Sequence, residues 1–357
     1  MSVPYTSLVA STTKKFEKGF VDQIVKDNFL LSAMIGKDLA PSVFKREMRE
    51  GDGEFADGLK LVDGGEKIFQ PLMYARNATV QGFSGYDVLD TTHAERFTAC
   101  EYDWKRVAGS VNLANEDLDK NSGSKEKLWD YMEGQLKNLQ VSKQEKINEY
   151  LIRPKTSSTE KVPLGIMDII PDDPTSDPTV GSIGGISVTG NDWWQSKNVD
   201  HNSAAFGTDP TGAGQTALRS LLRKVQFGRE HAQALLAGDV AYDRLERSMV
   251  NQIRYQGVAE QKLAQAGFLA FMFKGVPVVL EKEIDLQRTA ASLTGSAFYA
   301  LNFNFLKLYA MKNRFFKFSN EKEPTNQDTI VVHNITALQL CCNGRRYQGV
   351  MSEVIEA

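Results

Sequence analysis

The segment that most limits how this chain can fold is residues 46–92, which glycines divide into short apolar pieces such as Leu59-Lys-Leu-Val. Asp63-Gly64 is a strong signal for a β-hairpin turn. A two-stranded excursion is at best marginally stable in water unless another surface covers it. We therefore expect an extended β-hairpin loop that a partner subunit completes, with an ordinary surface loop as the alternative. The glycines are Gly51, Gly53, Gly58, Gly64, Gly65, Gly82 and Gly85.

The longest helical signal spans residues 125–152, where lysine and glutamate fill the faces beside an apolar stripe. Ser124 is suited to cap its start and Pro154 to stop it. Such a helix is roughly 40 Å long. Lys143 interrupts the stripe, which disfavours a coiled coil. The stripe consists of Leu128, Met132, Leu136, Leu139, Ile147 and Leu151.

Three further patterns predict elements before residue 216. Apolar residues such as Phe16 and Phe29 predict an amphipathic helix between residues 14 and 34, ended by Pro41. Alternation over 107–113 predicts a half-buried strand, paired with the run 97–104 before it. Residues 153–216 are rich in proline and glycine, with a strand edge at 184–188 and a loop anchor at Trp193-Trp194.

Residues 217–300 have the pattern of a compact α/β unit. Helices are expected around Leu218 and Leu245, and a buried strand at 232–236. The strand at 276–280 contains Pro277, which predicts an edge position or a bulge. Beyond residue 300 the apolar spacing shortens towards strands at 315–318, 329–332 and 338–340.

Size and charge bound the class of protein. At 357 residues the chain exceeds one usual hydrophobic core, so two domains are expected. A net charge of −3 gives no bulk attraction to nucleic acid. We expect Cys100, Cys341 and Cys342 to be buried, unpaired thiols of a reducing compartment. No leader pattern occurs, and no run reaches the roughly 20 apolar residues of a membrane span.

The sequence contains no recognisable catalytic motif, which argues against an enzyme and against a bound cofactor. The run 207–212 resembles a phosphate-binding loop, but Ala213 replaces its lysine. The acidic residues at 172–177 lack the pattern of a calcium loop, and none of the four histidines has a partner at zinc-site spacing. We therefore predict no catalytic, cofactor-binding or metal-binding residues, although a site assembled from distant residues would leave no such motif.

Several motifs in a fixed order carry a resemblance to a known family. They are Trp104-Lys, Val111-Asn-Leu, Leu164-Gly-Ile-Met-Asp-Ile-Ile, Val180-Gly-Ser-Ile-Gly-Gly-Ile, Asp192-Trp-Trp-Gln, Ile253-Arg-Tyr, Ala266-Gly-Phe, Phe273-Lys-Gly-Val-Pro-Val, Tyr299-Ala-Leu-Asn and Arg345-Arg-Tyr-Gln-Gly. In this order they resemble the major capsid protein of tailed bacteriophages, with the Hong Kong 97-type fold. The resemblance covers most of the chain from about residue 94 and is strongest from 253 to 350.

The resemblance implies an α+β protein with a Hong Kong 97-type capsid fold. Residues 1–45 would be an N-terminal arm and 46–92 the extended loop. The first part of a peripheral domain, with its long spine helix at 125–152, would occupy 93–214. An axial α/β domain would occupy 215–324, and 325–357 would return to the peripheral domain.

The resemblance also implies partners and an interface. Subunits would form hexamers and pentamers of an icosahedral head shell in the virion, assembled in the bacterial cytoplasm. Scaffolding, portal and decoration proteins are expected partners, and double-stranded DNA would be enclosed without sequence-specific binding. Lys60 and Lys67 are candidates for a covalent cross-link between subunits, with solvated lysines as the alternative. The candidate interface residues are Phe55, Lys60, Lys67, Phe69, Tyr74, Arg76, Arg254, Arg345 and Arg346.

Two other functions stay open at this stage. An encapsulin-like compartment shell shares the fold, and a soluble α+β enzyme would need a site assembled from distant residues. The shell hypothesis predicts that deleting residues 51–90 leaves a folded subunit that fails to assemble. It also predicts that charge reversal at Arg254 or Arg345 weakens assembly more than secondary structure, with a local anchor within the chain as the alternative for either arginine.

Overall fold

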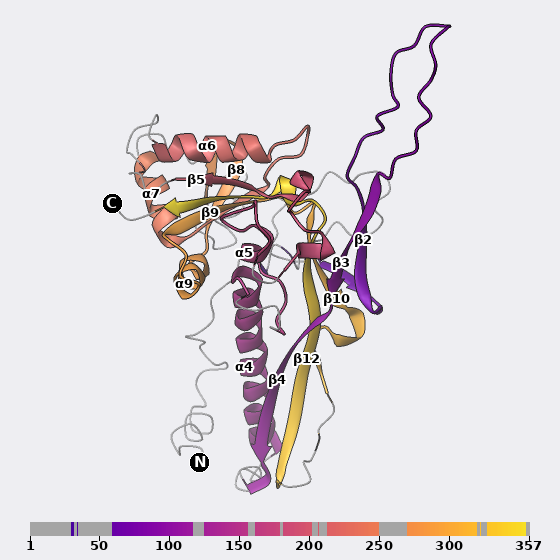
Figure 1. The fold of residues 1–357 in the computed structure, drawn as a ribbon. Helices are drawn as coiled ribbons and strands as arrows, with labels where there is room; N and C mark the ends of the chain where they lie inside the picture. Colours follow the sequence, from indigo (N-terminus) through magenta and orange to yellow (C-terminus); the bar gives the residue numbers. More distant parts are fainter. Residues whose placement is uncertain are drawn as a thin grey trace.

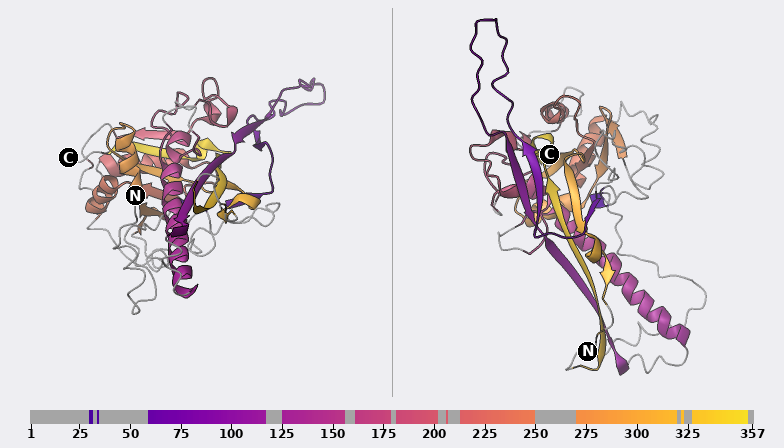
Figure 2. Two further views of the ribbon diagram at one scale, coloured as in Figure 1. Left: turned by 90° about the horizontal axis from the view of Figure 1, so that it is seen from below. Right: turned by 90° about the vertical axis from the view of Figure 1, so that its right-hand side faces the viewer.

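The computed structural model describes residues 30–31, 34, 59–116, 125–155, 161–178, 181–201, 206, 213–249, 270–319, 322 and 327–354. The fold is α+β, as predicted, and elongated (Figure 1). A sheet-and-helix body lies at one end. A long helix and two long strands run away from it, and a narrow loop projects in the opposite direction (Figure 2). Within the described residues, no helix is long and apolar enough to cross a membrane.

The body is built on a six-stranded sheet, in which the side chains alternate between two hydrophobic cores. Leu235, Phe298 and Met351 lie in one core, whereas Leu236 and Tyr299 lie in the other. This follows from the two-residue period of a strand that is buried on both faces. The strand order is β5 (Lys197–Asp200), β13 (Gly349–Val354), β9 (Ser296–Leu301), β6 (Ala234–Ala237), β8 (Val276–Leu280) and β7 (Ala270–Phe273).

Helices cover both faces of this sheet. Leu218 and Leu221 of α6 and Leu245 of α7 share the core of Phe298. Ile284 of α9 and Ile147 of α4 share the core of Tyr299. The predicted α/β unit is therefore confirmed, although the sequence patterns missed α9. The helices are α4 (Lys125–Ile152), α6 (Ala213–Val225), α7 (Asp239–Met249) and α9 (Glu283–Ala290).

The predicted edge position of the proline strand is wrong. β8 lies between β6 and β7, and Pro277 is tolerated because registered pairs with β6 begin only at Val278. On its other side Pro277 faces Met272 across a two-residue turn. The missing N–H therefore falls at the end of the parallel ladder.

A second sheet carries the long strands. β12 pairs with β4 over ten residue pairs, from Thr329 opposite Ala114 to Leu338 opposite Lys105. The predicted strand at 107–113 is confirmed, but its predicted pairing with the run 97–104 is wrong. The order is β1 (Leu59–Val62), β10 (Leu306–Met311), β12 (Thr329–Cys342) and β11 (Lys317–Phe318), with β4 (Lys105–Ala114) also on β12.

The long helix α4 lies against this ribbon, which confirms the predicted helix. Gly109 of β4 permits the approach, since an added Cβ would lie 2.6 Å from Leu139 Cδ1. Lys143 interrupts the apolar stripe because its buried ammonium donates hydrogen bonds to Asn334 O at 2.9 Å and Asn334 Oδ1 at 2.7 Å. Burial lowers the pKa of Lys143 to about 8.

The connection between α4 and α6 is irregular but anchored. The strand edge predicted at 184–188 is wrong: η2 (Ile183–Gly185) is a 3-10 turn in which Gly184 has φ 67°. Trp194 in η3 (Asp192–Trp194) is buried and donates a hydrogen bond to Ile183 O at 3.0 Å, so the predicted anchor is confirmed. The remaining short helices are α5 (Ile166–Ile169), η4 (Lys312–Arg314) and η5 (Arg345–Tyr347).

Two predictions remain, one on an N-terminal helix and one on the cysteines. The helix predicted between residues 14 and 34 lies outside the described residues except for Leu30, Leu31 and Met34, which are helical and buried. All three cysteines are buried free thiols, as expected.

The strands of each sheet do not all come from the residue ranges expected for one domain. β10 lies within 215–324 but pairs with β12 and β1. β13 lies within 325–357 but pairs with β9 and β5 of the body. Strand pairing thus joins segments that are distant in sequence, and the chain crosses between the two sheets more often than the ranges imply.

Candidate interaction surface

The extended loop begins from a two-stranded hairpin that is anchored on one face. β2 (Lys67–Met73) pairs with β3 (Phe97–Asp103). Gln70 donates a hydrogen bond to the Tyr309 hydroxyl at 2.8 Å, and Tyr102 donates one to Cys342 O at 2.6 Å. The buried face therefore ties the hairpin to β10 and β12.

The predicted hairpin turn at Asp63-Gly64 is wrong. The strands on either side of it, β1 and β2, belong to different sheets. The turn passes the chain from the long sheet to the hairpin, and the hairpin partner of β2 comes after the loop. The extended excursion is therefore residues 74–96, between β2 and β3.

The outer face of the hairpin carries exposed apolar side chains. Phe69, Met73 and Phe97 are exposed there, and Met73 lies directly opposite Phe97. Lys67 and Glu101 form an exposed ion pair at 3.1 Å at the end of the hairpin away from the loop. This ion pair raises the pKa of Lys67, first through the hydrogen bond and then through the charge of Glu101.

Tyr74 holds the base of the loop. Its backbone N–H donates to Arg96 O at 3.1 Å, and its hydroxyl donates to Glu95 O at 2.8 Å. Its ring stacks on Trp193 with 5.2 Å between centroids. The base is therefore fixed to the body, while residues 81–90 are all exposed.

The outer part of the loop has large apolar side chains in full contact with water. Tyr86 is 102% exposed and Val88 is 91% exposed. Contiguous exposed apolar surface of this kind is uncommon on monomers and marks interaction sites. The exposed apolar side chains of the loop and its hairpin, which we call the apolar loop surface, are Phe69, Met73, Tyr74, Val80, Phe83, Tyr86, Val88, Leu89 and Phe97.

The structure brings four of the predicted interface residues together. Lys67, Phe69, Tyr74 and Arg76 all lie on the hairpin or loop, and each has exposed surface. Lys60 lies apart from them on β1, with its ammonium 5.4 Å from the centre of the Tyr309 ring. Whether these residues contact another subunit stays a prediction.

The structure favours the alternative for Arg345, an anchor within the chain, over the predicted interface position. Arg345 is 0% exposed, and its Nε donates to Ile169 O at 2.9 Å, so it anchors α5 within the chain and does not lie at the surface. Arg346, the next residue, is partly exposed and packs its guanidinium 4.0 Å from the Phe227 ring centre. Phe55 and Arg254 lie outside the described residues.

Sequence reasoning missed the outer loop residues Val80, Phe83, Tyr86, Val88 and Leu89. Their signal was present, since apolar residues occur there without helical or strand periodicity between Gly82, Gly85 and Asp90. Residues that lack a periodic pattern cannot form a regular face against their own core.

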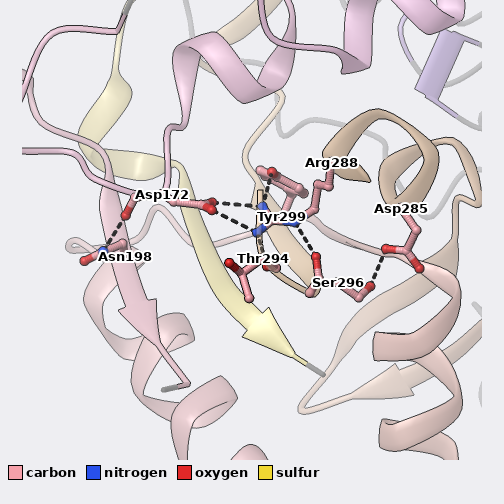
Figure 3. Close-up of polar contacts among 8 residues, drawn as sticks. Asp172, Asn198, Asp285, Arg288, Thr294, Ser296 and Tyr299 are labelled. Carbon is pink, nitrogen blue, oxygen red and sulfur yellow. Dashed lines mark hydrogen bonds and ion pairs between the residues drawn. The ribbon is translucent and has the colours of Figure 1, made fainter. Parts of the chain in front are cut away.

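A buried polar cluster attaches the segment after α5 to the body (Figure 3). Arg288 of α9 is buried, and all five of its N–H donors are used. Two reach the Asp172 carboxylate at 2.8 and 2.9 Å, and one reaches the Tyr299 hydroxyl at 3.2 Å. The last two reach Thr294 O at 2.9 Å and Gly295 O at 2.8 Å.

The Arg288 cluster has the character of a structural clamp. Burial is the largest single influence on Arg288 and opposes its charge, but the hydrogen bonds and charges of Asp172 and Tyr299 together outweigh it and raise the pKa of Arg288. Asp172 also accepts a hydrogen bond on its backbone O from Asn198 Nδ2 at 2.6 Å. Arg288 therefore has no donor left over to offer a ligand.

Among the residues described, no group of three or more histidine, cysteine, aspartate or glutamate side chains is placed to hold a metal ion. The apolar loop surface is therefore the strongest candidate functional feature.

No family model matches this chain, and no curated protein matches it in sequence. Solved structures do match. The capsid asymmetric unit of cyanophage A-1(L) has a TM-score of 0.58 at 14% identity, covering 83% of this chain and 90% of that chain. The capsid of Myoviridae phage XM1 has a TM-score of 0.50 at 10% identity, covering 83% and 89%.

The structure from Mycobacterium phage Adephagia has a TM-score of 0.50 at 11% identity and covers 98% of both chains. At such low identity, these likenesses establish a shared fold. The chain has the Hong Kong 97-type fold of these tailed-phage capsid structures, as its sequence motifs predicted.

Proposed function

We propose that this chain is the major capsid protein of a tailed bacteriophage. Its subunits form hexamers and pentamers of an icosahedral head shell, which encloses double-stranded DNA. The role is structural and not catalytic. The observation that carries the proposal is the apolar loop surface, held on a rigid base by a chain with a capsid fold.

The physical argument is that the loop is unfinished in a single subunit. Burying apolar surface contributes roughly 25 cal/mol per Å². Side chains such as Tyr86 and Val88, which are almost fully exposed, gain none of this within one chain. A neighbouring copy that covers them supplies the missing burial, and repeated copies close into a symmetric shell.

The division into regions takes a refined form within this proposal. The extended loop is residues 74–96, carried on the β2–β3 hairpin. The peripheral domain contains α4, β4, β10 and β12, and the axial domain contains the six-stranded sheet with α6, α7 and α9. Residues 1–45 remain assigned to an N-terminal arm.

Other partners follow from the same role. Scaffolding, portal and decoration proteins are further partners expected of such a shell. Assembly would take place in the bacterial cytoplasm, and the protein would end in the virion head. The net charge of −3 supports a shell that encloses DNA without a sequence-specific grip.

Negative-stain electron microscopy of the purified recombinant protein tests the proposal. An assembly protein is expected to form closed shells or capsomer rings that measure roughly tens of nanometres and contain many subunits. A uniform monomer or dimer that persists when scaffolding protein is supplied would contradict it and favour an enzyme. Shells that carry a cellular enzyme as cargo would favour the encapsulin-like alternative.

A further inference from the structure

A surface cluster of cations lies where three segments of the body meet. Lys197 begins β5, Lys224 lies in the last turn of α6, and Arg346 lies in η5. The Lys197 N–H donates to Gln348 O at 2.9 Å, which places η5 beside β5. Lys224 Nζ donates to Asn198 O at 3.0 Å, which places α6 beside the same strand. We call Lys197, Lys224 and Arg346 the basic cluster.

Arg346 is held in position by aromatic rings. Its guanidinium lies 4.0 Å from the Phe227 ring centre and 6.0 Å from that of Tyr347. Tyr347 in turn stacks on Phe305 at 4.0 Å with an interplanar angle of 8°. Within the described part of the chain, the guanidinium has no hydrogen-bond or carboxylate partner. A planar cation held by its face keeps its N–H edge available for an oxyanion.

Lys197 shows that the cluster is short of negative charge. Its pKa is lowered, first by burial and then by the charges of Arg346 and Lys224, with only Asp192 opposing. Its ammonium makes no hydrogen bond or ion pair with any described residue. Like charges that oppose one another in this way raise the free energy of the isolated chain, and a bound anion would relieve that cost.

The stability of the folded chain explains the position of only one cation of the basic cluster. Lys224 sits in the last turn of a helix, where a cation is favourable beside the terminal carbonyls. Lys197 begins a strand and Arg346 lies in a short turn, so neither gains from a helix end. Their convergence on Lys224 needs another reason.

We infer that the basic cluster is a phosphate-binding site, suited to the backbone of a nucleic acid. An arginine fork and two ammonium groups match the several oxygens and the charge of a phosphate. Phe227 is exposed beside them, and aromatic rings next to basic groups are platforms on which bases stack. The site is local, because the whole chain with its charge of −3 does not attract nucleic acid in bulk.

This inference is independent of shell assembly, which a different measurement reports. Subunits that fail to form shells can still bind phosphate, and shells can form without such a site. Electron microscopy therefore tests the proposed function, and titration of unassembled subunits tests the basic cluster.

The test compares the full chain with the double variant Lys197→Gln/Arg346→Gln. Binding of a 20-nucleotide single-stranded DNA is followed by fluorescence anisotropy over a range of NaCl concentrations, and inorganic phosphate is titrated in parallel. We expect the variant to bind DNA about 10-fold more weakly, with a log–log salt slope smaller by about 2. Lys161→Gln/Arg106→Gln removes the same charge from exposed positions elsewhere and should change neither quantity.

The remaining arms identify the source of the phosphate and guard against misfolding. Phosphate binding without DNA binding, lost in the double variant, supports a site for free phosphate. If the double variant unfolds, Lys224→Gln leaves the aromatic stack intact and should weaken binding about 3-fold. The inference is overturned if the wild type binds neither probe, if polyglutamate binds in their place, or if the control variant loses as much as the double variant.

Discussion

The extended loop 74–96 and the six-stranded sheet are both rich in apolar residues, yet they stand at opposite extremes of burial. Every residue of β9 is buried, and its alternate side chains fill two cores. Residues 81–90 are all exposed. The sheet is complete within one chain, whereas the loop offers side chains that one chain cannot cover. Folding and assembly are therefore supported by different parts of the molecule.

The hairpin β2–β3 has one buried face and one exposed face, so it lies between the buried sheet and the exposed loop. Gln70 and Tyr102 on its inner face bond to β10 and β12, while Phe69 and Met73 on its outer face meet water. A two-residue period divides one ribbon into an anchored face and a free face. The four predictions below test this division, from the largest expected effect to the smallest.

Replacing residues 76–94 with an Asn-Gly turn should abolish assembly and leave the subunit folded. The hydrogen bond from Tyr74 N to Arg96 O would still close the hairpin, and no buried side chain would be lost. Electron microscopy measures assembly, and urea unfolding measures the subunit.

Leu286→Ser is the matched control, because Leu286 is an exposed apolar residue of α9 outside the loop. Normal shells from the loop replacement would refute the role of the loop. The deletion of residues 51–90 that sequence alone suggested is unsuitable, because it would remove β1 and the buried Ile68 and Gln70 with them.

Arg288→Ala should destabilise the subunit by about 3 kcal/mol, because it leaves Asp172 without its partner and opens a buried clamp. Urea unfolding measures this change. Arg247→Ala removes an exposed arginine that pairs with Asp243 on one helix face and should cost less than about 0.5 kcal/mol. Equal losses in both variants would mean that the clamp contributes no more than a surface pair.

Lys143 should make stability depend on alkaline pH. Its pKa is about 8 in the folded chain and 10.5 for the ordinary lysine, so the unfolded chain holds more protons between these values. Stability relative to Lys143→Met should therefore rise with pH from about 8 to 10.5, by about 1 to 3 kcal/mol. Urea unfolding at several pH values gives the difference. The exposed Lys137→Met should show no such trend, and a flat difference for Lys143→Met would contradict the lowered pKa.

Tyr74→Ala should loosen the base of the loop without unfolding the body. Losing the stack on Trp193 costs about 1 kcal/mol, which corresponds to roughly 5-fold faster amide exchange at the hairpin base. Hydrogen exchange followed by mass spectrometry measures this rate. Tyr74→Phe keeps the ring and removes only the hydroxyl bond to Glu95 O, so most of the protection should remain.

The spacing of apolar residues predicted the helices and strands whose own sequence has a clear period. The helix at 125–152 and the strand at 107–113 follow from their apolar spacing, and Trp194 is the core anchor that its size suggested. The loop surface was only partly predicted. Phe69 and Tyr74 were named, but the outer residues such as Tyr86 and Val88 were not, because they follow no period.

Partners across the sheets could not be read from the same patterns. The run 97–104 was paired with the strand that follows it, whereas β3 pairs with β2 and β4 pairs with β12. The sequence left Arg345 as either an interface residue or an anchor within the chain, and only the fold shows that it is buried against α5. Asp172 and Arg288 are 116 residues apart and carry no joint signal in the sequence.

The sequence by itself determined the elements with a clear apolar period, such as the helix at 125–152 and the strand at 107–113, and the order of motifs that indicates a capsid fold. These properties depend on neighbours within a few residues, where steric and hydrophobic effects follow a short period. Only the tertiary structure decided which strands pair, which charges are buried and which apolar residues stay exposed. Those outcomes depend on contacts between distant segments, whose energies are set by the packing of the whole chain.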